Sequence, residues 1–203
     1  MSEEVLVVPN VIVAHVPEGI LYVDEEDTLT GSILGNARWM RRDEAEENPA
    51  FRQIIPQVLI EADGHLWGME RLTGSSEARL HHQWTCTVGG HMNPVDLDGH
   101  PLQMDTLWNG LLREMREEIT LPQDLALEMG FQGWLVDSTT AVSRVHLGAM
   151  FLARVTSLPD AATWAVGEPT KLAGHWIRRA DLRPIQWDSW SQAMVQWWLS
   201  RED

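Results

Sequence analysis

The sequence is poor in cysteine and in cationic side chains, and both shortages exclude classes of protein. A single cysteine, Cys86, among 203 residues leaves no partner for an internal disulfide. That usage fits a reducing compartment, so we expect a cytoplasmic protein. Fifteen Lys and Arg face thirty Asp and Glu, which gives a formal net charge of −15. Proteins that follow a phosphate backbone need a basic surface, so we expect no nucleic-acid partner.

Long hydrophobic runs and an N-terminal targeting segment are also missing. The longest apolar runs, such as residues 5–8, are far too short to cross a bilayer, so we expect no membrane partner. Residues 1–4 lack the basic start and apolar core of a secretory signal. A chain of 203 residues with 44% hydrophobic content suits one sizeable domain. We therefore predict a single domain over residues 1–203, with residues 1–50 set apart as an N-terminal extension.

Hydrophobic patterning predicts an α/β domain in which strands precede and follow a central helix. The charged segment 41–48 predicts a short exposed helix that ends before Pro49. Asp63 and Gly64 are typical of a hairpin turn between two strands. The elements expected are an opening strand or hairpin within 5–16, strands over 54–61, 65–72, 84–88, 133–137, 145–155 and 172–177, and helices over 104–119 and 187–200.

Three carboxylates in the central helix form the most informative cluster of the chain. Glu114, Glu117 and Glu118 stand at i, i+3 and i+4, so a helix places them on one face. With residues at steps of ~100°, Glu118 falls at the edge of the apolar arc rather than opposite it. Like charges at this spacing cost stability unless they share a cation. The spacing therefore predicts a divalent metal site.

A solvated face is the alternative interpretation of these carboxylates. Arg113 and Arg116 lie in the same segment and could pair with the glutamates at the surface. Gly110, however, precedes Glu114 by four residues and clears space on the acidic side. A glycine inside a helix costs about 1 kcal/mol relative to alanine. That cost suggests the close approach of a substrate or of a loop.

The segment from Arg113 to Glu118 resembles the second half of the Nudix box, G-x5-E-x7-R-E-U-x-E-E-x-G-U, in which U is aliphatic. Thr120 replaces the usual glycine near its end. The front half matches in two ways, because either Gly90 with Asp96 or Gly99 with Asp105 has the required spacing. We prefer the match through Gly89, Gly90 and Asp96, since the glycine pair follows a predicted strand. That match leaves extra residues before the helix.

The resemblance continues outside the box. Four short stretches are similar to a bacterial Nudix subgroup described as predicted phosphoesterases: residues 51–56, 77–80, 89–91 and 188–191. The similarity covers most of the chain from Phe51 onward, whereas residues 1–50 carry little family signal. It implies a Nudix-like α/β/α sandwich with a mixed central sheet.

The resemblance also implies a chemistry. Nudix enzymes use Mg²⁺ or Mn²⁺ to hydrolyse a nucleoside diphosphate linked to another moiety. By this similarity Glu114, Glu117 and Glu118 would hold the metal, which neutralises pyrophosphate charge and activates a water. Arg113 would orient a box glutamate through an ion pair. Gly89 and Gly90 would let the loop bend close to the metal site.

Candidate residues outside the box each have a second interpretation. Glu168 is our candidate for the general base, with an exposed surface glutamate as the alternative. Arg79 and Arg71 could meet substrate phosphates or pair with neighbouring acids. His91 and His146 could contact phosphate or metal, but we expect hydrogen-bonded structural histidines.

Two rival functions follow from the same fold. An isomerase of isopentenyl diphosphate needs a cysteine just before a Gly-His or Ser-His pair, whereas Gly89 stands there and Cys86 lies three residues earlier. A non-catalytic module that binds a nucleotide would not need all three box glutamates. We therefore predict a Mg²⁺- or Mn²⁺-dependent hydrolase of a phosphoanhydride bond in a small nucleotide-type substrate. Many relatives are homodimers, and the sequence leaves that state open.

Overall fold

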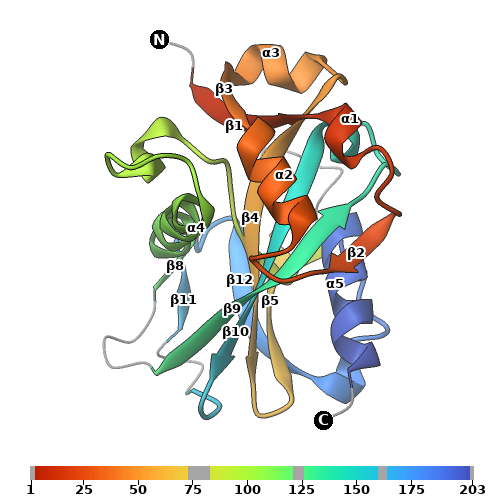
Figure 1. The fold of residues 1–203 in the computed structure, drawn as a ribbon. Coiled ribbons are helices and arrows are strands. Elements are labelled where there is room, and N and C mark those ends of the chain that lie inside the picture. Colours follow the sequence, from red (N-terminus) through yellow and green to blue (C-terminus); the bar gives the residue numbers. More distant parts are fainter. Residues whose placement is uncertain (1–2, 73–82, 121–125, 160–163, 202–203) are drawn as a thin grey trace. The chain divides into compact units, whose positions relative to one another are not determined.

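A computed structural model describes residues 3–72, 83–120, 126–159 and 164–201 of the chain (Figure 1). It separates into two compact units. The first unit comprises 1–57, 89–113 and 131–151, and the second comprises 58–88, 114–130 and 152–203. Five elements contribute residues to both units: β4 (Phe51–Ala62), β7 (Thr87–Gly89), α4 (Met104–Glu118), β9 (Leu127–Val136) and β10 (His146–Val155).

Most strands belong to one large sheet. Its main path has the order β12 (Leu172–Arg178), β5 (His65–Arg71), β4, β10, β9 and β2 (Gly19–Tyr22). The strands that pair beside this path are β1 (Glu4–Pro9), β3 (Arg38–Arg41), β6 (Trp84–Thr85) and β7 (Thr87–Gly89). A separate antiparallel pair joins β8 (Ile119–Thr120) to β11 (Ala165–Val166). Helices and a large mixed sheet together confirm the predicted α/β class.

The first unit begins with a buried strand. Residues 5–8 of β1 are 0% exposed, and β1 pairs antiparallel with both β3 and β4. The chain then enters the short helix α1 (Asn10–Val13), so the expected opening strand is present but a hairpin within 5–16 is not. Helix α3 (Arg42–Glu47) ends before Pro49, as predicted. Helix α2 (Thr28–Asn36) is an addition to the expected elements, and it begins where the Asp27 side chain accepts the Leu29 N–H.

The second unit contains the predicted hairpin. Strands β4 and β5 pair antiparallel, with Glu61 opposite Leu66 and Ala62 opposite His65. Both turn residues have positive φ, 44° at Asp63 and 72° at Gly64, as a type I′ turn requires. Strand β12 pairs antiparallel along β5. Helix α5 (Ser189–Ser200) begins at Asp188, whose side chain accepts the Ser191 N–H.

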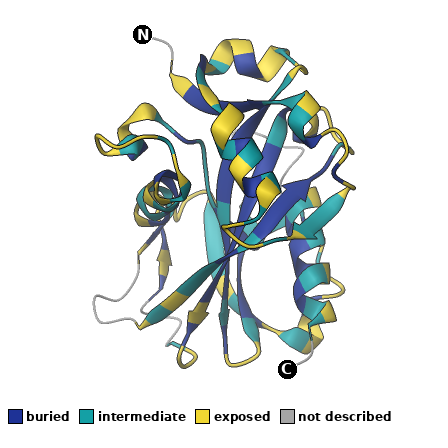
Figure 2. Ribbon diagram, viewed as in Figure 1, coloured by how far each residue is buried: buried dark blue, intermediate teal, exposed yellow. Residues whose placement is uncertain are grey.

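Aromatic side chains fill the interior of each unit, and the central strands are buried over most of their length (Figure 2). In the second unit Trp67, Trp164 and Trp176 contact one another with ring centroids 4.9 to 5.4 Å apart. In the first unit Trp108 packs edge-on against Phe151 at 4.6 Å. Such tilted and edge-to-face contacts are the favoured geometries of aromatic pairs. No helix among the described residues is long and apolar enough to span a membrane.

Candidate active site

Helix α4 carries the three predicted carboxylates, and its faces are those expected from the sequence. Leu107, Leu111 and Met115 are buried at 0 to 2% exposure and form its apolar side. Glu117 is exposed, whereas Glu118 is half-buried, as expected for a carboxylate at the edge of the apolar arc. Helical spacing and burial therefore agree along the whole helix.

The carboxylate oxygens of this helix are the ligand type that a hard divalent cation takes. Mg²⁺ takes one or two carboxylates and completes its octahedron with waters and substrate oxygens. Glu114 and Glu118 are half-buried, and Glu117 is open to solvent, so water and substrate have access to the carboxylate face. Within the described part of the chain, no group of three or more His, Cys, Asp or Glu side chains is arranged to hold a metal ion.

Arg113 joins the loop before α4 to the helix. Its Nε donates to Asp96 Oδ1 at 2.9 Å and its Nη2 donates to Asp96 Oδ2 at 3.1 Å. The same Nη2 donates to the His91 carbonyl oxygen at 2.8 Å. Asp96 is 4% exposed and also accepts the Asn93 N–H at 2.8 Å. A bidentate pair of this kind is among the stronger hydrogen-bonded contacts of proteins, so it holds the loop in one position.

The two candidates for the acidic position of the box differ sharply in environment. Asp96 is buried and binds the box arginine, Arg113. Asp105 is exposed, and its side chain accepts a hydrogen bond from Gln103 within the first turn of α4. The match that runs from Gly90 to Asp96, with extra residues between Asp96 and the helix, stays our prediction.

Other parts of the chain approach two glycines of the motif region closely. A Cβ at Gly89 would collide with the Pro56 carbonyl oxygen, and the backbone there has φ of +156°. A Cβ at Gly110 would collide with the Met92 side chain and lie 3.1 Å from Asp96 Oδ2. Gly110 therefore makes room for the loop that follows Gly89 and Gly90, which is one of the two reasons anticipated for it.

Glu168 follows strand β11, which pairs with β8 directly after the carboxylate helix. Val166 of β11 lies opposite Ile119 of β8, and the Gly167 N–H donates to the Glu118 carbonyl oxygen at 2.6 Å. Glu168 itself is exposed and its Oε1 binds Lys171 Nζ at 2.6 Å. The backbone thus anchors this segment to the helix terminus, while the carboxylate makes a surface ion pair.

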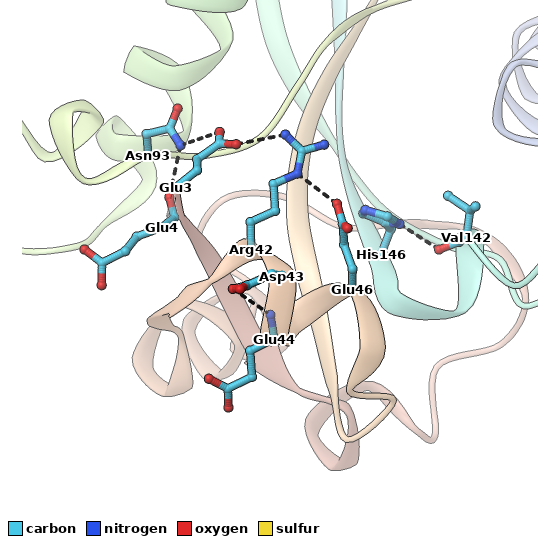
Figure 3. A network of polar contacts seen from close by, with 9 residues as sticks. All are labelled: Glu3, Glu4, Arg42, Asp43, Glu44, Glu46, Asn93, Val142 and His146. Atoms are coloured by element: carbon cyan, nitrogen blue, oxygen red, sulfur yellow. Dashed lines mark hydrogen bonds and ion pairs between the residues drawn. The ribbon is translucent and has the colours of Figure 1, made fainter. Parts of the chain in front are cut away.

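The two histidines pack against each other in the first unit, with ring centroids 5.7 Å apart. His146 Nδ1 hydrogen-bonds the Val142 carbonyl oxygen at 2.7 Å, as expected of a structural histidine (Figure 3). His91 Nε2 is buried and has no hydrogen-bond partner among the described residues. Burial, with smaller contributions from Arg42 and His146, lowers the pKa of His91 to about 4, so its ring is neutral at pH 7.

An ion-pair network near the N-terminus joins Glu3, Arg42, Glu46 and Asn93 (Figure 3). Arg42 binds Glu3 at 2.9 Å and Glu46 at 2.9 Å. The Asn93 side chain donates to Glu3 Oε1 at 3.1 Å and to the Glu4 carbonyl oxygen at 3.0 Å. The first strand and α3 are therefore tied to the loop that carries Asp96.

Arg52 was missed by sequence reasoning, although a charged residue inside an apolar strand is a usable signal. Arg52 is 6% exposed, and burial lowers the pKa of its guanidinium. It donates to Asn10 Oδ1, to Ser138 Oγ and to the carbonyl oxygens of Asp137, Ser143 and His146. One buried cation thus holds the whole turn between β9 and β10.

Two further sequence expectations concern single residues. Arg79, expected at substrate phosphates, lies outside the described residues. Cys86 is 1% exposed, its N–H donates to Ser191 Oγ at 3.0 Å, and burial raises the pKa of its thiol. Such a thiol is inert, which agrees with the argument against an isomerase.

Comparison with known proteins gives two extended likenesses. No family model matches the chain. Protein YmaB of Bacillus subtilis is 30% identical over 205 aligned positions, which cover 96% of this chain and 97% of YmaB. The crystal structure of Tm1382, a proposed Nudix hydrolase, superposes with a TM-score of 0.77 at 28% identity and covers 97% of this chain and 98% of that one. With so little of the chain left uncovered, both likenesses include most of residues 1–50.

Proposed function

The chain belongs to the Nudix hydrolase superfamily, and on that premise we propose that it hydrolyses a phosphoanhydride bond in a nucleoside diphosphate-linked small molecule with Mg²⁺ or Mn²⁺. The observation that carries the proposal is the bidentate pair between Arg113 and Asp96. It supports one continuous box, in which Gly90, Asp96, Arg113 and the helix glutamates occupy the motif positions.

The proposed metal ligands are Glu114, Glu117 and Glu118. A divalent cation, when bound there, neutralises pyrophosphate charge and lowers the pKa of a bound water. The protein itself positions the carboxylates and the loop that faces them. Arg113 directly precedes Glu114 in α4, so its pair with Asp96 fixes the loop to the turn that presents the carboxylates. The close approach of Gly89 to β4 fixes the start of the same loop.

Glu168 is our proposal for the group that removes a proton from the attacking water. The hydrogen bond from Gly167 to the Glu118 carbonyl oxygen supports it, because it keeps the segment beside the C-terminal end of α4. A general base must come within hydrogen-bond reach of its proton, so Glu168 would have to leave Lys171 when substrate is bound.

The test is a substrate screen with a matched pair of variants. Nucleotide sugars, dinucleoside polyphosphates, ADP-ribose, NADH, CoA and nucleoside triphosphates are incubated with Mg²⁺ or Mn²⁺, and products are separated by chromatography. For any compound turned over, Glu117→Gln should lower kcat by about 100-fold or more. Glu47→Gln, at an exposed position of α3, is the control and should leave kcat unchanged.

Two results would count against the proposal. If Glu117→Gln turns over the same compound at an unchanged rate, the proposal that α4 provides the metal ligands is wrong. Binding of a nucleotide without turnover of any compound, with either metal, would indicate a non-catalytic nucleotide-binding module.

A further inference from the structure

The second unit contains a cavity that shares no residue with the proposed active site. It has a volume of about 300 Å³ and lies where the β4–β5 turn, the end of β10 and the end of α5 meet. That volume is near the lower limit of small-molecule sites, about 300 to 1,000 Å³. The charged side chains of its lining are Glu61, Asp63, Arg154, Arg179 and Arg201.

The two carboxylates of the lining are already engaged within the protein. Glu61 Oε1 accepts a hydrogen bond from Arg154 Nε, and Glu61 Oε2 accepts one from Trp198 Nε1. Asp63 Oδ2 accepts the Leu158 N–H at 2.8 Å. Both carboxylates therefore already accept hydrogen bonds within the protein. Arg179 and Arg201 make no hydrogen bond to them in these contacts.

Arg201 has unused hydrogen-bonding capacity at this cavity. Its guanidinium lies over the Trp197 ring, 4.8 Å from the centroid. Its Nη1 is buried and has no hydrogen-bond partner among the described residues. A buried donor without a partner is costly, because its bonds to water are lost and nothing replaces them. A ligand that accepts hydrogen bonds would remove that cost.

The other two arginines complete the cationic wall. Arg154 donates from Nε to Glu61 Oε1, and its side chain is half-exposed. Arg179 lies over the Trp198 ring at 4.6 Å, and its Nη2 donates to the carbonyl oxygens of Leu199 and Arg201. Arg179 thereby holds the backbone of Arg201 in place.

The charge of the lining contrasts with that of the chain. Three arginines and two carboxylates give +1 at the cavity, whereas the whole chain has −15. Guanidinium groups present flat pairs of donors that match phosphate oxygens. The net charge of +1, together with Arg201 Nη1, which has no partner among the described residues, favours an anionic ligand with several oxygens. We propose that this cavity binds the phosphate group of a small metabolite.

The experiment is a calorimetric titration with inorganic phosphate at constant ionic strength, in a chelator so that no metal is bound. Wild-type protein is compared with Arg201→Gln, Arg154→Gln and Arg183→Gln. Arg183 is exposed and does not line the cavity, so it is the matched control. We expect Kd to rise at least about tenfold in the first two variants and to stay unchanged in the third. Arg201→Lys keeps the charge without the fork, and its Kd should lie between those of wild type and Arg201→Gln.

Several outcomes overturn the proposal. One is the absence of phosphate binding by the wild-type protein at millimolar concentration. Another is an equal Kd in wild type and Arg201→Gln, provided that both melt at the same temperature. Tighter binding of succinate than of phosphate would replace the phosphate class by a carboxylate. A raised Kd in Glu117→Gln would place the anion at the carboxylate helix instead.

Discussion

The two halves of the proposed Nudix box are built in different ways. The back half is one helix, so its geometry follows from local spacing, and the burial of Met115 beside exposed Glu117 agrees with that spacing. The front half is a loop with one short 3-10 turn, Pro94–Leu97, which contains Asp96 and is capped by Asn93. Its position depends on contacts between residues distant in sequence, above all the pair between Asp96 and Arg113. In one continuous motif, the structure of the back half is therefore set by helical spacing, and the position of the front half is set by tertiary contacts.

Removal of the Asp96 carboxylate should have the largest effect on stability. Breaking one partner of a buried pair leaves the other charge uncompensated, at a cost of about 3 to 5 kcal/mol. Arg113 is partly exposed, so Asp96→Ala should cost about 3 kcal/mol in the free energy of unfolding, measured in urea. Asp105→Ala, at the alternative box position, should stay within about 0.5 kcal/mol. Equal costs at the two aspartates would contradict the match through Gly90.

A methyl group at Gly89 should have the next largest effect. Gly89→Ala introduces a Cβ that collides with the Pro56 carbonyl oxygen, and backbone atoms cannot rotate away as side chains do. We expect a loss of about 2 to 3 kcal/mol in the free energy of unfolding. Gly99→Ala is the matched control, because Gly99 also has positive φ, 76°, but no atom lies within 4 Å of its Cβ position. Its cost should be about 1 kcal/mol.

Elements that depend on neighbouring residues can be predicted from the sequence, whereas contacts between distant residues cannot. The helix over 104–119, the hairpin turn at Asp63 and Gly64, and the exposed helix before Pro49 were predicted closely, because each depends on neighbouring residues. Helix α2 was missed despite the capping aspartate, Asp27, since its apolar pattern is weak. Capping residues followed by a modest pattern are a signal that deserves more weight.

The contacts of the candidate sites were harder to predict than the elements. Sequence spacing to the helix fits Asp105, whereas the strand before Gly89 and Gly90 favours Asp96, and the contact of Asp96 with Arg113 could not be predicted. The sequence predicts that something approaches Gly110 closely, but it does not identify Met92 and Asp96 as the residues that do so. Arg154, Arg179 and Arg201 meet at one cavity from separate elements, and no local pattern relates them. Tertiary contacts of this kind have no periodicity that a sequence could display.

His91 makes the front half sensitive to acid. Its pKa in the folded protein is about 4, below the ordinary value of 6.5, so between these values the unfolded chain binds the extra proton. The contribution of His91 to stability is complete above about pH 6.5 and falls as pH decreases toward 4, by about 2 to 3 kcal/mol in total. Arg42 and His146 add to the effect, while Glu3 and Glu46 oppose it.

The His91→Phe variant isolates this contribution. Nε2 of His91 has no partner within the described residues, so a phenyl ring loses no hydrogen bond there. The stability difference between wild type and His91→Phe should shift in favour of the variant as the pH falls from 6.5 to 4.5. A difference that is independent of pH would show that His91 titrates normally.

Substitutions in the Glu168–Lys171 ion pair should have the smallest effect on stability. This pair lies on the segment whose backbone is hydrogen-bonded to the end of α4. Lys171 and Glu168 pair at the surface, with side chains 47% and 61% exposed, and such pairs contribute about 0 to 1 kcal/mol. Lys171→Met and Glu168→Gln should therefore each change the free energy of unfolding by less than about 0.5 kcal/mol. Their effects on turnover should differ, because only Glu168→Gln removes the proposed base. It should lower kcat by about 100-fold and remove the acidic limb of the pH–rate profile, whereas an unchanged profile would leave Glu168 with its surface ion pair alone.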